Sequence, residues 1–85
     1  MGHDHHAHTD EQLRLWFIQK VAEEAGIDRS VIRESEPLSR YGITSMQTVT
    51  ITGDLETLLG RRISPTLLWE NPTIDAVVTV LTTSM

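Results

Sequence analysis

Ser45 is the side chain best placed to do chemistry in this sequence. It lies in the stretch Tyr41–Gln47, YGITSMQ, directly before an apolar pattern typical of a helix. Thr44 and Gln47 have the spacing of a capping box, so Ser45 falls in the first helical turn. Unpaired amides and the positive end of the helix dipole favour a phosphate there. Ser45 is therefore a candidate for modification by another enzyme, and the alternative is that it only helps to cap the helix.

Other catalytic residue types are sparse. The chain has no cysteine, which excludes disulfides, thiol catalysis and Cys-based zinc sites. All four histidines lie within the first eight residues, and the five glycines are dispersed rather than gathered into a phosphate-binding loop. Neighbouring carboxylates such as Glu23 and Glu24 fall on presumed polar helix faces, and so small a chain leaves little room for a catalytic pocket. We therefore expect that this domain is not an enzyme.

The first residues, MGHDHHAH, could chelate a divalent metal through His3, His5, His6, His8 and Asp4. A folded metal site also needs a scaffold, and this segment has no apolar anchor. We interpret residues 1–9 as a disordered His-rich tail or tag and residues 10–83 as the domain. The alternative is a metal-binding protein that loses its function when residues 1–8 are removed.

Charge and composition exclude several classes of partner. Seven basic and twelve acidic side chains give a formal net charge of −5, and only Arg61 and Arg62 place two basic residues together. A nucleic-acid binder needs clustered Lys and Arg, so that class is set aside. No apolar run approaches the length that spans a bilayer, and no signal-peptide pattern opens the chain. The lack of cysteine fits a reducing compartment, so we expect a cytoplasmic location. We also expect the domain to be a monomer when isolated.

Helical periodicity covers most of the remaining chain. A first helix is predicted from Thr9 or Asp10 to Gly26, and its apolar face consists of Leu13, Trp16, Phe17, Val21 and Ala25. Because Trp16 and Phe17 are adjacent, we expect one of them to be partly exposed. Residues 27–44 form a long loop with one short helical turn near Asp28–Ile32. Scattered apolar residues should anchor this loop: Ile27, Val31, Ile32, Leu38, Tyr41 and Ile43.

Three further helices complete the pattern. The second runs from Ser45 to Leu59 and ends at Gly60, with Gly53 inside it as a possible point of close packing. A short helix is predicted over Pro65–Trp69, started by Ser64 and Pro65. Thr73 then caps a last helix whose apolar stripe is Ile74, Val77, Val78 and Leu81. The fold class is all-α: a small four-helix bundle of three main helices plus one short helix, with a long loop between helices one and two.

The sequence resembles acyl carrier protein domains, especially those of modular (type I) polyketide synthases. The family's loop-to-helix junction around a serine stands here as YGITSMQTV, preceded by the lead-in EPLSRYGI. The end of the family's second helix matches DLETLLG, and its link into the last helix matches RRISPTLLWENPTIDAVV. The resemblance covers about residues 13–82, in the family's order and close to its spacing.

The resemblance implies that Ser45 receives 4′-phosphopantetheine from coenzyme A through a separate, Mg²⁺-using phosphopantetheinyl transferase. The terminal thiol of the arm then carries acyl or polyketide intermediates as thioesters. Implied partners are a ketosynthase, an acyltransferase or acyl-adenylate ligase, and other synthase domains. One position departs from the family, because Thr44 stands where aspartate is usual, and that aspartate is associated with the encounter with the transferase.

The family also implies a recognition surface on the second helix and the loop before it. The candidates for partner recognition in this chain are Ile43, Thr44, Met46, Gln47, Thr50, Asp54 and Arg61. Met46 is equally consistent with exposure and with partial burial, whereas Trp69 is expected to be in the core or half-buried under the short helix. Two alternatives stay open: a peptidyl carrier domain of a nonribosomal peptide synthetase, and a helical docking or adaptor module that binds equally well as Ser45→Ala.

Overall fold

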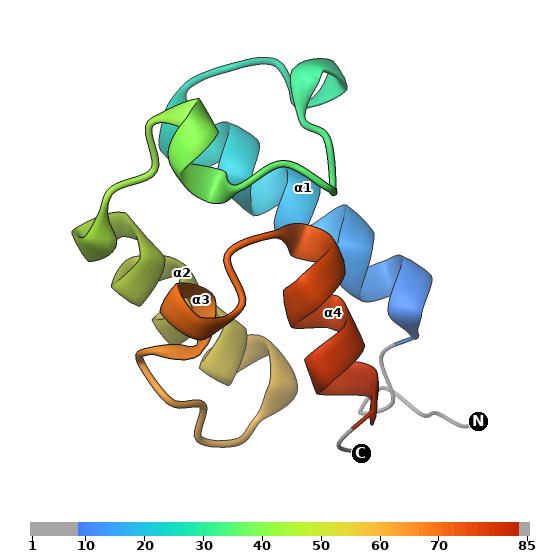
Figure 1. Ribbon diagram of the computed structural model, residues 1–85. Helices are drawn as coiled ribbons and strands as arrows, with labels where there is room; N and C mark the ends of the chain where they lie inside the picture. The colour runs from blue at the N-terminus through green and yellow to red at the C-terminus, as the bar shows by residue number, and fades with distance from the viewer. Residues whose placement is uncertain (1–8, 84–85) are drawn as a thin grey trace.

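The computed structural model describes residues 9–83, which form an all-α bundle (Figure 1). Helix α1 spans Asp10–Ala25, α2 spans Ser45–Leu59, α3 spans Leu67–Glu70 and α4 spans Ile74–Thr83. Both views place α1 behind α2 and α4, with the short α3 in front and between them. The predicted fold of three main helices and one short helix is confirmed. The predicted His-rich tail lies outside the described residues, except for Thr9.

The core forms where the apolar stripes of the helices meet. Leu13, Phe17 and Val21 of α1 are fully buried, and so are Ile51 and Leu55 of α2. The predicted stripe of α4 is buried along its whole length: Ile74, Val77, Val78 and Leu81. Trp16 is half-buried and meets Phe17 edge to face, as expected for adjacent positions on a helix. Burial of these stripes holds α4 in place although its Val and Thr residues have low helix propensity.

The long loop between α1 and α2 contains two 3₁₀ turns, η1 over Arg29–Val31 and η2 over Leu38–Tyr41. The turn near Asp28–Ile32 was predicted, and η2 was not. Three of the predicted anchors, Ile32, Leu38 and Ile43, are buried, and Tyr41 is half-buried. The prediction was wrong for Ile27 and Val31, which are exposed. No residue of η1 is buried, because this turn stands out from the body of the protein.

One arginine joins three parts of the chain that are distant in sequence. Arg14 of α1 forms ion pairs with Asp10 of its own helix, with Glu34 of the loop at 2.6 Å, and with Asp75 of α4. The amide of Asp75 also donates to the carbonyl of Glu34 at 3.0 Å. Hydrogen bonds to Asp10, Asp75 and Glu34 raise the pKa of Arg14 above its ordinary value. The cluster therefore fixes the loop and α4 against α1.

Two local predictions differ from the structure. The short helix begins at Leu67 rather than Pro65, because residues 64–66 form a turn in which the Ser64 hydroxyl accepts from the Thr66 amide at 3.3 Å. Gly53 does not allow close packing, since a side chain added there would meet no atom within 4 Å. The open space at Gly53 means that this glycine lowers the stability of α2 without a packing benefit.

We expect Gly53→Ala to stabilise the domain by about 1 kcal/mol, the difference in helix propensity between the two residues. Gly60→Ala should destabilise it, because Gly60 ends α2 with a φ of 69° that a residue with a Cβ adopts only under strain. Denaturant unfolding followed by circular dichroism measures both changes. A destabilised Gly53→Ala variant would contradict the open environment of Gly53.

Arg14→Met should destabilise the domain by about 1 kcal/mol, the upper end for partly exposed ion pairs. The sign of the pH dependence follows from the raised pKa of Arg14. A raised folded-state pKa gives stability that is complete below the unfolded-state pKa and is lost only above it. For arginine that loss lies far into the alkaline range, so the difference between wild type and variant should stay constant between about pH 6 and pH 9. Unfolding curves across this range test it, and a difference that vanishes at its alkaline end would contradict it.

Candidate functional site

Ser45 is the first residue of α2, and its neighbours supply the cap. The hydroxyl of Thr44 accepts from the Gln47 amide at 3.2 Å, and the Gln47 side chain accepts from the Thr44 amide at 2.9 Å. The predicted capping box is therefore confirmed. Ser45 itself is exposed, and its hydroxyl makes no hydrogen bond with any part of the chain that the structure describes. Capping is thus the role of Thr44, and the Ser45 hydroxyl is free to react.

The start of α2 is electrostatically suited to an anion. The amides of the first turn point out of the helix start, where the dipole is positive. The first turn of α2 contains no acidic residue, whereas that of α1 contains Asp10 and Glu11. Residues 45–53 include no ionisable side chain at all. A negatively charged group attached to Ser45 would therefore meet the helix end without a competing carboxylate.

The chain reaches Ser45 through a tight turn that needs glycine. Gly42 has a φ of 78°, in the left-handed region, and its amide donates to the carbonyl of Ser39 at 3.0 Å. The next residue, Ile43, is 6% exposed and anchors the turn in the core. This turn places Ser45 at the surface directly after a buried anchor and a cap.

Two side chains of the first turns tie α2 to its neighbours. The amide group of Gln47 donates to the Glu24 carbonyl in the last turn of α1, at 2.8 Å. The hydroxyl of Thr48 donates to the Ser45 carbonyl at 2.6 Å, and it accepts from the indole N–H of Trp69 at 2.7 Å. The serine turn is thereby connected to α1 on one side and to α3 on the other.

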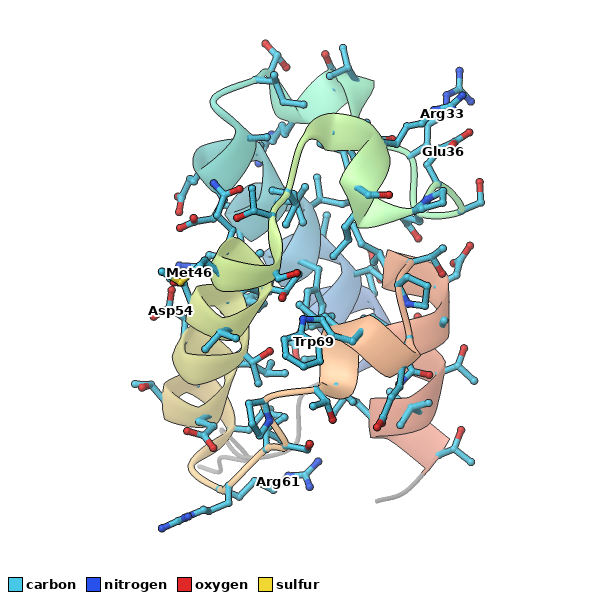
Figure 2. The ribbon with its side chains drawn as sticks, turned by 60° about the vertical axis from the view of Figure 1, so that its left-hand side comes forward. Arg33, Glu36, Met46, Asp54, Arg61 and Trp69 are labelled. Carbon is cyan, nitrogen blue, oxygen red and sulfur yellow. The ribbon has the colours of Figure 1, made fainter. Side chains whose placement is uncertain are left out.

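A small cavity of about 160 Å³ opens beside Ser45. Its lining is mostly apolar and includes Leu38, Ile43, Leu68 and Trp69, with Thr48 next to the serine. Trp69 is 52% exposed and lies between α2 and α4 (Figure 2). It is therefore not a core residue, and of the two places expected for it only the half-buried one agrees with the structure. Its hydrogen bond to Thr48 holds the indole at the surface. Sequence reasoning missed this pair because the two residues are 21 positions apart and no local pattern links them.

The predicted recognition residues fall into two groups. Met46, Thr50 and Arg61 are exposed, and Met46 is the most exposed large apolar side chain of the described residues at 79%. Arg61 follows the far end of α2, well away from Met46 (Figure 2). Of the two states open to Met46, the structure shows the exposed one. Val49, which sequence reasoning did not single out, adds a second exposed apolar side chain to this helix.

The other candidates have structural partners of their own. Thr44 and Gln47 form the cap, and Ile43 is buried. Asp54 pairs with Lys20 of α1 at 3.1 Å, and this hydrogen bond raises the pKa of Lys20. A role in recognition stays a prediction for all of the candidates. Those that are exposed and take no part in the cap or in an ion pair within residues 9–83 are Met46, Thr50 and Arg61.

The described residues contain no cluster of His, Asp and Glu that could hold a metal ion. The histidines of the alternative metal-binding prediction lie outside residues 9–83. Within the same residues, no helix is both long and apolar enough to cross a membrane.

Comparison with known protein families matches residues 16–81 to the phosphopantetheine attachment site family. The chain is 33% identical over 72 residues to a phenolphthiocerol/phthiocerol polyketide synthase of Mycobacterium tuberculosis, a match that covers 85% of this chain and 4% of that protein. It is 35% identical over 77 residues to polyketide synthase PksM of Bacillus subtilis, covering 91% of this chain and 2% of PksM. The chain thus spans only a small part of the length of these relatives.

Solved structures of carrier proteins have the same fold. A free-standing peptidyl carrier protein from Acinetobacter baumannii superposes with a TM-score of 0.84 at 28% identity, over 92% of this chain and 98% of that one. The acyl carrier protein LipD from Actinoplanes friuliensis gives 0.74 at 37% identity, over 99% and 93%. Asl1650, an acyl carrier protein from Anabaena described as having a variant phosphopantetheinylation-site sequence, gives 0.77 at 27% identity, over 86% and 83%.

Thr44→Ala should destabilise the domain by about 1 kcal/mol, because it removes the side-chain cap of α2. Thr44→Asp keeps a capping acceptor and places a carboxylate at the positive helix end, so its free energy of unfolding should equal or exceed that of the wild type. Chemical denaturation of the three proteins gives this comparison. A Thr44→Ala variant as stable as the wild type would show that the capping box contributes nothing to stability.

Proposed function

The chain belongs to the phosphopantetheine attachment family, and on that premise we propose that Ser45 is the residue that carries its 4′-phosphopantetheine. The observation that carries this proposal is the exposed, unbonded hydroxyl in the first turn of α2. A phosphodiester at this position gains from the free amides and the uncompensated dipole of the helix end. The protein is a carrier domain homologous to the acyl carrier domains of polyketide synthases, and the proposed extent of that domain is residues 10–83.

The attachment is a phosphoryl-type transfer in which the domain supplies only the nucleophile. The Ser45 oxygen forms a bond to the phosphorus that bears pantetheine in coenzyme A. The bond from that phosphorus to the adenosine nucleotide breaks, and 3′,5′-adenosine bisphosphate leaves. The proton of the hydroxyl passes to a base of the transferase, which also supplies Mg²⁺ for the charge on the phosphates. The domain itself is proposed to be non-catalytic.

The covalent arm supplies the thiol that the sequence lacks. The chain has no cysteine, so a thioester with an acyl group needs the thiol of phosphopantetheine. A flexible tether lets one thiol visit several active sites, and its high effective concentration makes tight docking unnecessary. We propose that the chain carries acyl or polyketide intermediates between a ketosynthase, an acyltransferase or acyl-adenylate ligase, and other synthase domains in the cytoplasm.

Thr44 in place of the usual aspartate is compatible with this role. Thr44 performs the structural task of the position, because its hydroxyl caps α2. The Anabaena acyl carrier protein with a variant phosphopantetheinylation site has the same fold, which supports the inference that carriers tolerate changes in this region. What Thr44 lacks is a negative charge beside Ser45, and we expect this loss to slow the transferase rather than to prevent modification.

A peptidyl carrier of a nonribosomal peptide synthetase is the second candidate, favoured by the likeness to the Acinetobacter structure. The curated relatives at 33% and 35% identity are polyketide synthases and favour the acyl carrier. Loading assays with an acyl-coenzyme A donor and with an aminoacyl donor distinguish the two functions.

Incubation with coenzyme A, Mg²⁺ and a broad-specificity phosphopantetheinyl transferase should add one phosphopantetheine to the wild type and none to Ser45→Ala. Intact-mass spectrometry measures the gain, and circular dichroism confirms that both proteins are folded. Ser39→Ala serves as the matched control, since Ser39 is a second exposed serine that lines the same cavity. The control should be modified like the wild type.

Thr44→Asp separates a slow carrier from a protein that is no carrier. If the wild type gains no mass but Thr44→Asp does, Ser45 is a competent attachment site and Thr44 restricts which transferase acts. A folded Thr44→Asp that also gains nothing with several transferases would overturn the attachment role of Ser45 and favour the adaptor alternative.

A further inference from the structure

The turn that contains Ser45 is held from two sides by side chains that leave the serine uncovered. On one side, Gln47 bonds to the Glu24 carbonyl at the end of α1. On the other, Thr48 links the Ser45 carbonyl to the indole of Trp69, which belongs to α3. We call the second link, Ser45–Thr48–Trp69, the serine bracket.

The geometry of the serine bracket is tight. The Thr48 hydroxyl has one proton, and it donates this proton to the Ser45 carbonyl at 2.6 Å. Its lone pair accepts the indole proton of Trp69 at 2.7 Å, so the donor and an acceptor site of the hydroxyl are both used. Thr48 is 7% exposed, whereas Ser45 and Trp69 are exposed, so the two bonds are partly buried and share a hydroxyl that water hardly reaches.

Trp69 gains little else from its position. The residue as a whole is 52% exposed, and the residues before it in α3, Leu67 and Leu68, are the ones that enter the core. Among the described residues, the one hydrogen bond of its side chain is the bond from the indole N–H to Thr48, which ties the ring to α2. Because α3 has only four residues, this bond also fixes the orientation of α3 against the start of α2.

We propose that Thr48 and Trp69 are positioning residues, which hold the Ser45 turn in the geometry that a transferase needs. This inference rests on the proposed role of Ser45 as the attachment residue. Phosphoryl transfer requires the attacking oxygen to be in line with the leaving group, and a small misplacement of the nucleophile costs rate even when binding is unchanged. An exposed residue at the end of a helix is prone to fraying, so a bond to its carbonyl from a fixed neighbour restricts that motion.

Four variants separate positioning from general stability. Thr48→Val has the same shape but loses both bonds, whereas Thr48→Ser keeps the hydroxyl. Trp69→Phe removes the indole donor and keeps an aromatic ring. Thr52→Val is the matched control, because Thr52 is also buried, one turn further along α2, and its hydroxyl donates only to the Thr48 carbonyl, at 2.8 Å.

The readout is the rate of phosphopantetheine transfer at saturating coenzyme A with the carrier concentration varied. We expect kcat to fall about fivefold or more in Thr48→Val, with KM changed by less than about twofold. Thr48→Ser and Thr52→Val should stay within about twofold of the wild type in both constants. Loss of a direct contact with the transferase would instead raise KM. Because Thr48 is buried, a raised KM with an unchanged kcat in Thr48→Val would contradict the positioning role.

The double variant tests whether the two residues act as one unit. Trp69→Phe should lower kcat like Thr48→Val, and the combination should be no slower than Thr48→Val alone, because both remove the same link. The indole N–H signal of Trp69, assigned by its loss in Trp69→Phe, should shift in Thr48→Val and remain in place in Thr52→Val. This signal reports the hydrogen bond independently of activity.

Each result that differs from these expectations has a definite meaning. Thr48→Val with an unchanged kcat, or Thr52→Val with an equally lowered kcat, would overturn the positioning role. So would an indole signal that is the same in wild type and Thr48→Val. A different result would overturn the proposed function itself: no uptake of phosphopantetheine by the wild type or by Thr44→Asp, although both are folded. The positioning role of the serine bracket would then also be overturned.

Discussion

On the proposed role of Ser45 as the attachment residue, the start of α2 has to be fixed in space while its first side chain stays uncovered. The elements around Ser45 meet this constraint. A buried serine could not be reached by another enzyme, and a serine on a frayed end would not hold its geometry. The protein meets both conditions by placing the fixing groups on the residues around Ser45. Thr44 caps, Ile43 anchors, and Gln47 and Thr48 bind to neighbouring elements, so no contact falls on the serine hydroxyl itself.

The small core explains why this fixation relies on polar links. A chain of 85 residues buries few large side chains, and a short helix such as α3 adds only Leu67 and Leu68 to the core. Single hydrogen bonds and ion pairs then act together with buried anchors such as Ile32 and Leu38 to fix the connecting segments. Arg14 links the long loop and α4 to α1 through ion pairs, and Trp69 links α3 to α2 through its hydrogen bond to Thr48. Both side chains join elements that are far apart in sequence but adjacent in the bundle.

Local patterns in the sequence were sufficient for the main helices and for the place of Ser45 in the first turn of α2. The box of Thr44 and Gln47 acts over three residues, and the stripes of α1 and α4 repeat over a turn or two, so each can be identified without the fold. The structure bears out the limits of α2 from Ser45 to Leu59. What local patterns could not supply were contacts between distant residues. The pairing of Asp54 with Lys20, the exposure of Ile27 and Val31, and the bond between Trp69 and Thr48 all depend on how the elements pack.

The protein domain and its covalent arm have separate tasks. The domain contributes one hydroxyl and a surface around it, and the reactive thiol comes with the arm. Because the tether supplies a high local concentration, brief contacts with partners are sufficient, and the proposed recognition surface beside Ser45 is consistent with such contacts. Residues 45–53 carry no charge, and Met46 and Val49 expose modest apolar area there. Such a surface binds weakly and with little dependence on salt, whereas a strongly charged one would favour a single oppositely charged partner. A carrier that must meet several enzymes in turn is better served by a fixed serine on a neutral surface than by tight docking.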